Sequence, residues 1–137
     1  MNREILFRGK NLKNKWVYGH YLEADRCNRT GRKPHKAWIV EHFAANGGWL
    51  TPLVHHAVQE ETVGQYTGLK DKNGTKIFEG DILRAVRRDL EKICHVEYIG
   101  YSFYVPELHW DLSDAAFDYQ LEIIGNIYNN PELLRME

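Results

Sequence analysis

A tight turn in the middle of the chain constrains the fold more than any other feature of this sequence. Residues 66–86 read YTGLKDKNGTKIFEGDILRAV. Asp71 can close an Asx-turn on its own backbone, and Asn73 and Gly74 are residue types that tolerate positive φ. We therefore predict a hairpin turn at Asn73 and Gly74, between a strand that ends near residues 66–69 and one that starts near residues 76–77.

Short apolar segments separated by turn signals run along the rest of the chain. They lie at residues 5–7, 15–23, 37–43, 62–66, 93–99, 101–105 and 121–127. Asn130 is a good helix N-cap and Pro131 is tolerated at the first helical position, which predicts a short C-terminal helix. Many short strands joined by turns predict a mainly β fold. We expect a small antiparallel SH3-like or related barrel with extra hairpins and that helix.

Length and composition fit one small domain. The chain has 137 residues, 43% of them hydrophobic, and a domain typically has about 100–150 residues. We therefore predict one domain over residues 1–137. No apolar run approaches the roughly 20 residues that span a bilayer, and the N-terminus lacks the apolar core of a signal peptide. We expect a cytoplasmic protein without membrane contact, in which Cys27 and Cys94 are free thiols.

Positive and negative charges are unevenly distributed along the chain. Residues 1–92 hold 17 Lys and Arg against 11 Asp and Glu, whereas residues 93–137 hold only Arg135 against eight acids. We favour the interpretation that the two parts pack against each other within one molecule. Alternatively, the imbalance pairs one copy with another as a homo-oligomer, or presents a basic face to a partner.

A basic segment at residues 25–36, DRCNRTGRKPHK, interrupts the strand pattern and predicts an exposed loop. Its cations are Arg26, Arg29, Arg32, Lys33 and Lys36. Such a loop is typical of a solvated connection, which we favour. It could instead contact a partner or the phosphates of a nucleic acid, because basic loops neutralise that backbone without reading its sequence.

Patterns that would indicate catalysis or a bound cofactor are weak. His55 and His56 are adjacent, as are Cys94 and His95, and adjacent strand residues face opposite ways, so neither pair suits one metal ion. No nucleophile elbow or phosphate-binding loop occurs. Two acids, Glu79 and Asp81, would share one strand face about 7 Å apart, as a two-carboxylate hydrolase could require. We expect no catalytic residue, cofactor or metal, and consider the pair a solvent face or a turn contact.

Two long segments resemble the YopX family of phage and prophage proteins. They are VGQYTGLKDKNGTKIFEGDIL at residues 63–83 and IIGNIYNNPELL at residues 123–134, and residues 5–22 also fit the opening hairpin of that family. The resemblance implies a small, mainly β protein encoded by temperate phages or integrated elements of bacteria. It brings no assigned activity and no catalytic residue.

These observations favour a phage or prophage accessory protein that acts as a non-catalytic binding module. We expect its partner to be a host or phage protein, bound through exposed aromatic side chains and strand edges. A nucleic-acid-binding barrel, with weak binding through the basic loop, is the alternative. A small hydrolase is a further alternative.

Overall fold

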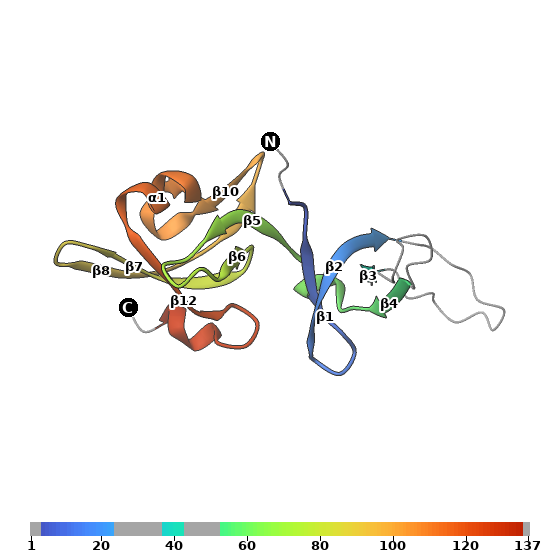
Figure 1. Ribbon diagram of the computed structural model, residues 1–137. Coiled ribbons are helices and arrows are strands. Elements are labelled where there is room, and N and C mark those ends of the chain that lie inside the picture. Colours follow the sequence, from blue (N-terminus) through green and yellow to red (C-terminus); the bar gives the residue numbers. More distant parts are fainter. Residues whose placement is uncertain (1–3, 24–36, 43–52, 136–137) are drawn as a thin grey trace. The chain divides into compact units, whose positions relative to one another are not determined.

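The computed structural model describes residues 4–23, 37–42 and 53–135, and the structural statements below concern these residues (Figure 1). The chain divides into two compact units, Met1–Gln65 and Tyr66–Glu137. Each unit has its own cluster of buried side chains. The expectation of a single domain over residues 1–137 stays a prediction.

The first unit is an antiparallel sheet. Its elements are β1 (Phe7–Lys10), β2 (Trp16–Glu23), β3 (Ala37–His42), β4 (Leu53–Ala57), the 3₁₀ helix η1 (Glu60–Thr62) and the first residues of β5 (Gly64–Lys70). The strand order is β4-β3-β2-β1, and Gly64 and Gln65 at the start of β5 pair with β1. The apolar segments at residues 5–7 and 15–23 predict a first hairpin around residues 9–14, and this hairpin is confirmed, because β1 and β2 pair across it.

Alternation along β2 decides which side chains form the core of the first unit. Val17 is buried and Tyr21 packs against the same cluster, whereas Tyr18, His20 and Leu22 on the opposite face are exposed. In the sequence, Trp16, Tyr18, His20 and Leu22 form an aromatic-rich stripe that suggests the opposite orientation, with these side chains packed inward, and this expectation is wrong. Val17 and Tyr21 instead face the cluster that Ile39 and other buried residues form.

The second unit contains most of the short elements. They are β6 (Lys76–Phe78), β7 (Asp81–Arg87), β8 (Leu90–His95), β9 (Glu97–Ile99), β10 (Ser102–Val105), η2 (Pro106–Leu108), β11 (Trp110–Asp111), α1 (Leu112–Asp118), β12 (Gln120–Asn126) and η3 (Pro131–Arg135). Two of its sheets are antiparallel and three-stranded, with orders β12-β7-β8 and β11-β10-β9. In addition, β5 pairs with β6.

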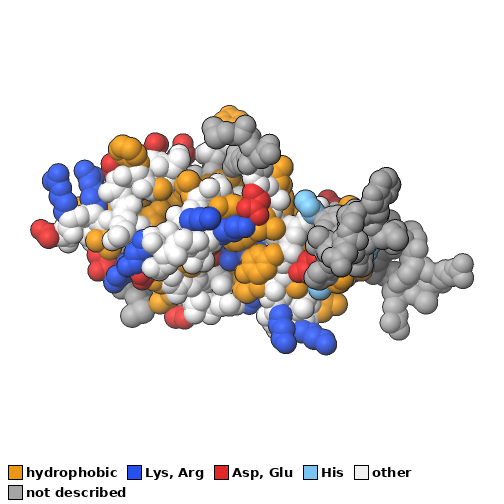
Figure 2. Space-filling model, in the orientation of Figure 1, with side chains coloured by type: hydrophobic (Ala, Val, Ile, Leu, Met, Phe, Trp, Pro, Cys, Tyr) orange, Lys and Arg blue, Asp and Glu red, His pale blue; other side chains and the backbone are white. Residues whose placement is uncertain are grey.

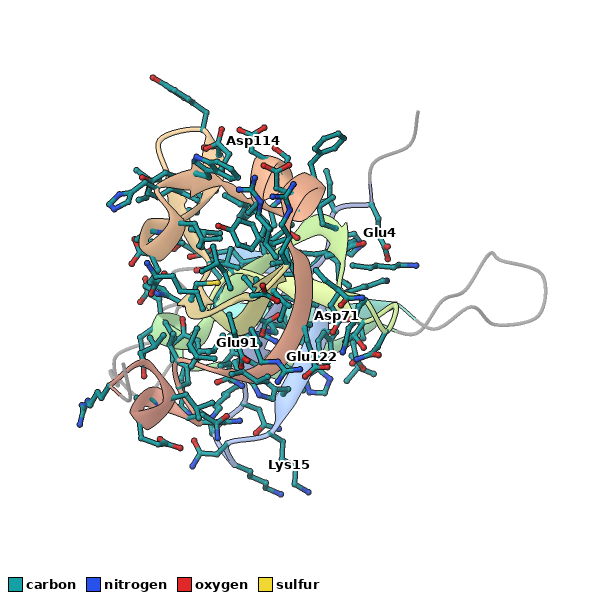
Figure 3. All side chains as sticks on the ribbon, turned by 90° about the vertical axis from the view of Figure 1, so that its left-hand side faces the viewer. Glu4, Lys15, Asp71, Glu91, Asp114 and Glu122 are labelled. Atoms are coloured by element: carbon teal, nitrogen blue, oxygen red, sulfur yellow. The ribbon has the colours of Figure 1, made fainter. Side chains whose placement is uncertain are left out.

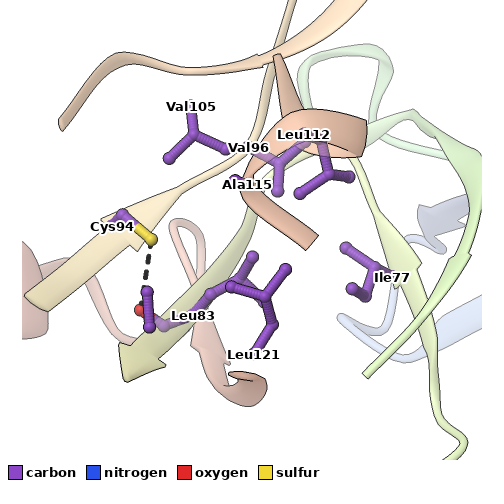
Figure 4. Close-up of a cluster of buried hydrophobic side chains, with 9 residues drawn as sticks. Ile77, Leu83, Cys94, Val96, Val105, Leu112, Ala115 and Leu121 are labelled. Carbon is purple, nitrogen blue, oxygen red and sulfur yellow. Dashed lines mark hydrogen bonds between the residues drawn. The ribbon is translucent and has the colours of Figure 1, made fainter. Parts of the chain in front are cut away.

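One apolar cluster holds the second unit together (Figure 4). Its side chains come from β6, β7, β8, β10, α1 and β12 and from Val96 between β8 and β9. Leu83, Val105 and Leu112 are almost completely buried. Cys94 is buried, and its Sγ lies 3.6 Å from the carbonyl oxygen of Leu83. Its side chain serves the core as a small apolar group. Cys27 lies outside the described residues, so the expectation that both cysteines are free thiols stays a prediction.

The predicted mainly β, antiparallel architecture is confirmed. In the described residues the sheets are open and form no closed barrel, so the SH3-like expectation holds only at the level of a small β protein. The predicted hairpin turn is also confirmed, because Lys70 of β5 pairs with Lys76 of β6 across it. The short C-terminal helix exists as η3, which starts at Pro131 as predicted.

Candidate functional site

The basic residues that the sequence singled out as a contact surface lie outside the described residues. They are Arg26, Arg29, Arg32, Lys33 and Lys36. Their role in binding a partner or a nucleic acid therefore stays a prediction. The candidate sites below are built from the remaining polar clusters and exposed apolar side chains.

The buried carboxylate of Asp71 stabilises the central turn at Asn73 and Gly74 (Figure 3). Asp71 Oδ1 accepts hydrogen bonds from the backbone N–H groups of Asn73 and Thr75, at 2.9 Å each. Gly74 follows with φ +81°, a conformation that glycine adopts without strain. This arrangement is the predicted Asx-turn, so Asp71 stabilises the fold.

The carboxylate pair considered for a hydrolase is not formed on one strand. Glu79 and Gly80 make a turn between β6 and β7, and Gly80 has φ +91°. Asp81 is buried, and its Oδ2 accepts the backbone N–H of Phe78 at 2.7 Å. The predicted continuous alternation through these residues is therefore wrong. The suggested contact of Asp81 with the backbone of a turn is confirmed.

A histidine at the end of β8 lies between two carboxylates. His95 Nδ1 is 2.5 Å from Glu107 Oε2, and its Nε2 is 2.7 Å from Glu97 Oε1. The backbone N–H of His95 donates to the other oxygen of Glu107 at 3.1 Å. These three contacts connect β8, β9 and η2.

The electrostatics of this cluster follow from its geometry. The hydrogen bond to Glu107 is the largest influence, and together with Glu97 it raises the pKa of His95 to about 9 against the opposing effect of burial. Burial alone would raise the pKa of Glu107, but the hydrogen bond from His95 lowers it. At neutral pH the ring is an imidazolium with both N–H groups donating. We conclude that His95 connects three segments of the chain and is poorly suited to act as a general base.

Sequence reasoning missed this cluster. His95 was considered only together with its neighbour Cys94, whose side chain points into the core. Glu107 lies 12 residues further along the chain, and no spacing rule connects a strand end to a 3₁₀ helix at that distance. The only local signal is that His95 and Glu97 are two residues apart, which places both side chains on one face of an extended chain.

Large apolar side chains are exposed where β9 turns into β10. Tyr98 is 49% exposed, Ile99 50% and Tyr101 97%. We call these three residues the β9–β10 tip. Gly100, with φ +67°, occupies the two-residue turn together with Tyr101. The rings of Tyr98 and Phe103 make an edge-to-face contact on one face of this hairpin, with ring centroids 5.1 Å apart.

The chain around this tip is acidic. Residues 97–118 contain Glu97, Glu107, Asp111, Asp114 and Asp118 but no Lys or Arg. Glu97 and Asp111 both pair with Tyr104, one from each neighbouring strand, so the two acids lie in one row across the sheet. On the face shown in Figure 2, hydrophobic, acidic and basic side chains all reach the surface of the second unit. The exposed apolar side chains of the tip belong to a segment, residues 97–118, whose Asp and Glu residues are not balanced by Lys or Arg of the same segment.

The first unit carries a contrasting basic hairpin. The guanidinium carbon of Arg8 lies 4.4 Å from the centroid of the Trp16 ring, and Lys10 Nζ lies 5.5 Å from it. Both distances suit cation–π attraction. Lys13 and Lys15 are exposed in the connecting turn. Arg8 is buried, whereas Lys10 is half-buried beside Trp16. An accessible cation beside an aromatic ring is a combination that also binds single-stranded nucleic acid.

In the described part of the chain, no group of three or more His, Cys, Asp or Glu residues is arranged to hold a metal ion. The expectation that the protein needs no metal stays a prediction. None of the helices described here has the length and apolar character that crossing a membrane would require.

Comparison with protein families matches residues 6–135 to the family described as YopX protein. Among solved structures, the chain is similar to the crystal structure of protein EF1440 from Enterococcus faecalis, with a TM-score of 0.58 and 22% sequence identity. That match covers 97% of this chain and 99% of the other, and at this identity it shows a shared fold alone. Comparison with curated proteins found no match. Because the family match includes both sequence motifs and nearly the whole chain, the protein belongs to the YopX family.

Proposed function

We propose that this protein is a phage or prophage accessory protein that binds another protein in the bacterial cytoplasm and carries out no catalysis of its own. The observation that carries the proposal is the exposure of Tyr98, Ile99 and Tyr101 at the β9–β10 tip. The three side chains are close together along one hairpin, with Ile99 and Tyr98 on opposite faces of β9, and large exposed apolar side chains that gather at one place are typical of interaction sites. Tyrosine is also among the residues enriched at protein interfaces.

The location of the tip supports a protein partner over a nucleic acid. The segment that contains it, residues 97–118, has five Asp and Glu residues and no Lys or Arg, and like charges repel a phosphate backbone. A protein surface has no such restriction, because its charge can be complementary. Nucleic acid is therefore the disfavoured partner at this surface.

Nucleic-acid binding is a second candidate, carried by a different part of the chain. Lys10, Lys13 and Lys15 lie on or next to the β1–β2 hairpin, with Trp16 paired to Lys10 next to the turn and Tyr18 exposed. Stacking and phosphate contacts would cooperate on such a surface. Glu60 and Glu61 of η1 belong to the same unit and reduce its net charge, which makes this the weaker of the two proposals.

Affinity capture with matched variants tests the protein-binding proposal. The full chain and its Tyr98→Ser/Tyr101→Ser variant are immobilised and exposed to lysate of the bacterium that carries the gene, with nucleic acid digested in half of each sample. The control variant is Leu12→Ser, which removes an exposed apolar side chain from the first unit (65% exposed, between the values of Tyr98 and Tyr101). Melting temperatures of all three proteins are measured first.

We expect a protein that is captured by the wild type and the control, is lost with the double variant, and survives digestion. Capture that is unchanged in the double variant contradicts the role of the tip. Capture that disappears only after nuclease treatment favours the nucleic-acid alternative. A tip variant that no longer folds is replaced by Tyr101→Ser alone, because that side chain is almost fully exposed.

A further inference from the structure

We propose that β9 is a docking edge for an extended, basic segment of the partner protein, which adds to the β11-β10-β9 sheet as a fourth strand. This inference rests on the protein-binding function proposed above and names the chemistry of the partner. It follows from three features of β9: its position at the sheet edge, the faces to which its side chains point, and the charge around it.

The first feature is the position of β9 in its sheet. In the sheet of order β11-β10-β9, β9 is an edge strand, and all three of its residues are exposed. Ile99 pairs with Ser102 across a two-residue turn, and Tyr98 pairs with Phe103. In a two-residue hairpin the closing pair exchanges hydrogen bonds and the next pair does not. The N–H and C=O of Tyr98 therefore point away from β10, toward the open edge.

The free length of this edge is short. The neighbouring residue Val96 is already bonded, since its N–H donates to Asp81 and its carbonyl accepts from Gly80, at 3.1 and 2.9 Å. Among the described residues no such backbone partner is recorded for Tyr98. Short edge strands discourage indiscriminate pairing. Binding therefore has to draw on side chains as well as on the backbone.

The side chains of β9 select the partner by alternation. Glu97 and Ile99 share one face, and Tyr98 is on the other face, where its ring contacts Phe103. A strand added beside β9 would place one side chain next to Glu97 and the following one next to Tyr98. Complementarity requires a cation at the first position and an apolar group at the second.

Charge decides between a heterologous partner and a second copy of this chain. Five acids and no Lys or Arg occur in residues 97–118, and protonated His95 offsets only part of that charge. Antiparallel pairing of two β9 strands would bring two such acidic surfaces together, and like charges directly opposite are destabilising. A basic segment meets no such repulsion, so it is the occupant that the chemistry of this edge fits.

Three synthetic peptides test strand addition on the full-length protein. The first is an acetylated, amidated octapeptide of alternating Lys and Val. The second replaces each Lys with Glu. The third keeps Lys and Val but carries N-methyl groups on the Val nitrogens. In the proposed register a Val lies opposite Tyr98, so this change removes the N–H donors that face β9 without changing the side-chain charges. Binding is followed by titration, with amide chemical shifts of residues 96–102 as the positional readout.

We expect the Lys-Val peptide to bind at least about tenfold more tightly than either of the other two, with the largest amide shifts at Tyr98 and Ile99. Equal binding of the N-methylated peptide overturns strand addition, and equal binding of the acidic peptide overturns the charge argument. Absence of Lys-Val binding at about 1 mM peptide overturns the proposal as a whole.

A pair of variants separates backbone pairing from contact with the tyrosine ring. Tyr98→Ala removes the ring and keeps the N–H, whereas Tyr98→Pro removes both, and proline is tolerated on a strand edge that faces outward. We expect the proline variant to lose Lys-Val binding and the alanine variant to lose only part of it. Equal loss in both shows that the ring alone matters. If lysate capture depends on the tip while these peptide results fail, the proposed function stands without strand addition.

Discussion

The carboxylate of Asp71 accepts a hydrogen bond from the backbone N–H of Ile123, 52 positions further along the chain, at 3.1 Å. Beside it, the N–H of Lys72 donates to the carbonyl of Leu121 at 2.8 Å, and its ammonium lies 2.8 Å from Glu122. Figure 3 shows Asp71 and Glu122 close to each other. The two segments that carry the family resemblance therefore contact each other, and Asp71 joins them.

Replacement of Asp71 tests this connection. Asp71→Ala leaves three backbone N–H groups without their acceptor, and we expect a loss of about 1–3 kcal/mol in the free energy of unfolding. Urea denaturation followed by circular dichroism measures the change. Lys70→Ala, an exposed neighbour, serves as the control and should change stability by less than about 0.5 kcal/mol. Equal stability of the wild type and Asp71→Ala would contradict the structural role.

Acid should weaken the same contact. Burial alone would raise the pKa of Asp71. The pKa is instead lowered by the hydrogen bonds from Ile123, Thr75 and Asn73 and by the charge of Lys72. A lowered folded-state pKa contributes stability that is present above the unfolded value, about 3.9, and is lost as the pH falls. We expect Asp71→Asn to show a shallower loss of stability than the wild type below about pH 4, measured from melting temperatures at stepped pH.

Substitution of Gly74 tests the backbone conformation of the turn. Its φ of +81° resists a β-branched residue, while a Cβ there would contact nothing within 4 Å. We therefore attribute the expected loss for Gly74→Val, about 1–3 kcal/mol, to backbone strain alone. Asn73→Ala in the same turn has no positive φ to satisfy and is the control. An unchanged melting temperature for Gly74→Val would show that the turn relaxes.

The cluster around His95 predicts a loss of stability in alkali. Its pKa is raised from 6.5 to about 9 in the folded protein. The stabilisation is therefore complete below about pH 6.5 and disappears as the pH rises through 9. We expect a decrease of about 1–3 kcal/mol across that window, since one pKa unit corresponds to about 1.4 kcal/mol.

Two variants isolate this effect from other groups that titrate in the same range. His95→Gln should be less stable than the wild type at pH 6 and should show a flatter dependence up to pH 9.5. His55→Gln, at an exposed position of β4, should retain the dependence of the wild type. Parallel curves for the wild type and His95→Gln would contradict the assignment.

Nucleic-acid binding is expected to be no tighter than about micromolar near physiological salt, the range of non-specific binding. Fluorescent single- and double-stranded oligonucleotides are titrated at two salt concentrations. For duplex DNA, each lost phosphate contact should reduce the logarithmic salt slope by about 0.9. Two variants distinguish the two basic segments. One is Lys13→Ala/Lys15→Ala, and the other replaces all five cations of residues 26–36. Nanomolar, sequence-dependent binding would overturn our order of proposals.

A large part of the local structure followed from the sequence. The central hairpin was predicted because an Asx-turn, a positive φ and strand alternation each depend on residues a few positions apart. The C-terminal helix was predicted for the same reason, from Asn130 and Pro131. The error at residues 79–81 has a local cause as well. Alternation was extended across Gly80, whose positive φ ends the strand and starts a turn.

The candidate sites depended on tertiary structure. No short-range sequence pattern predicts the contact of His95 with Glu107 or that of Asp71 with Ile123, because these contacts join separate segments of the chain. The same holds for exposure: eight tyrosines look alike in the sequence, yet Tyr66 is buried and Tyr101 is almost fully exposed. Composition and alternation thus determined a small antiparallel β protein. Only the packing of sheets and helix around the apolar clusters decided that the sheets stay open and that β9 lies at an edge, because burial and pairing are set by long-range contacts.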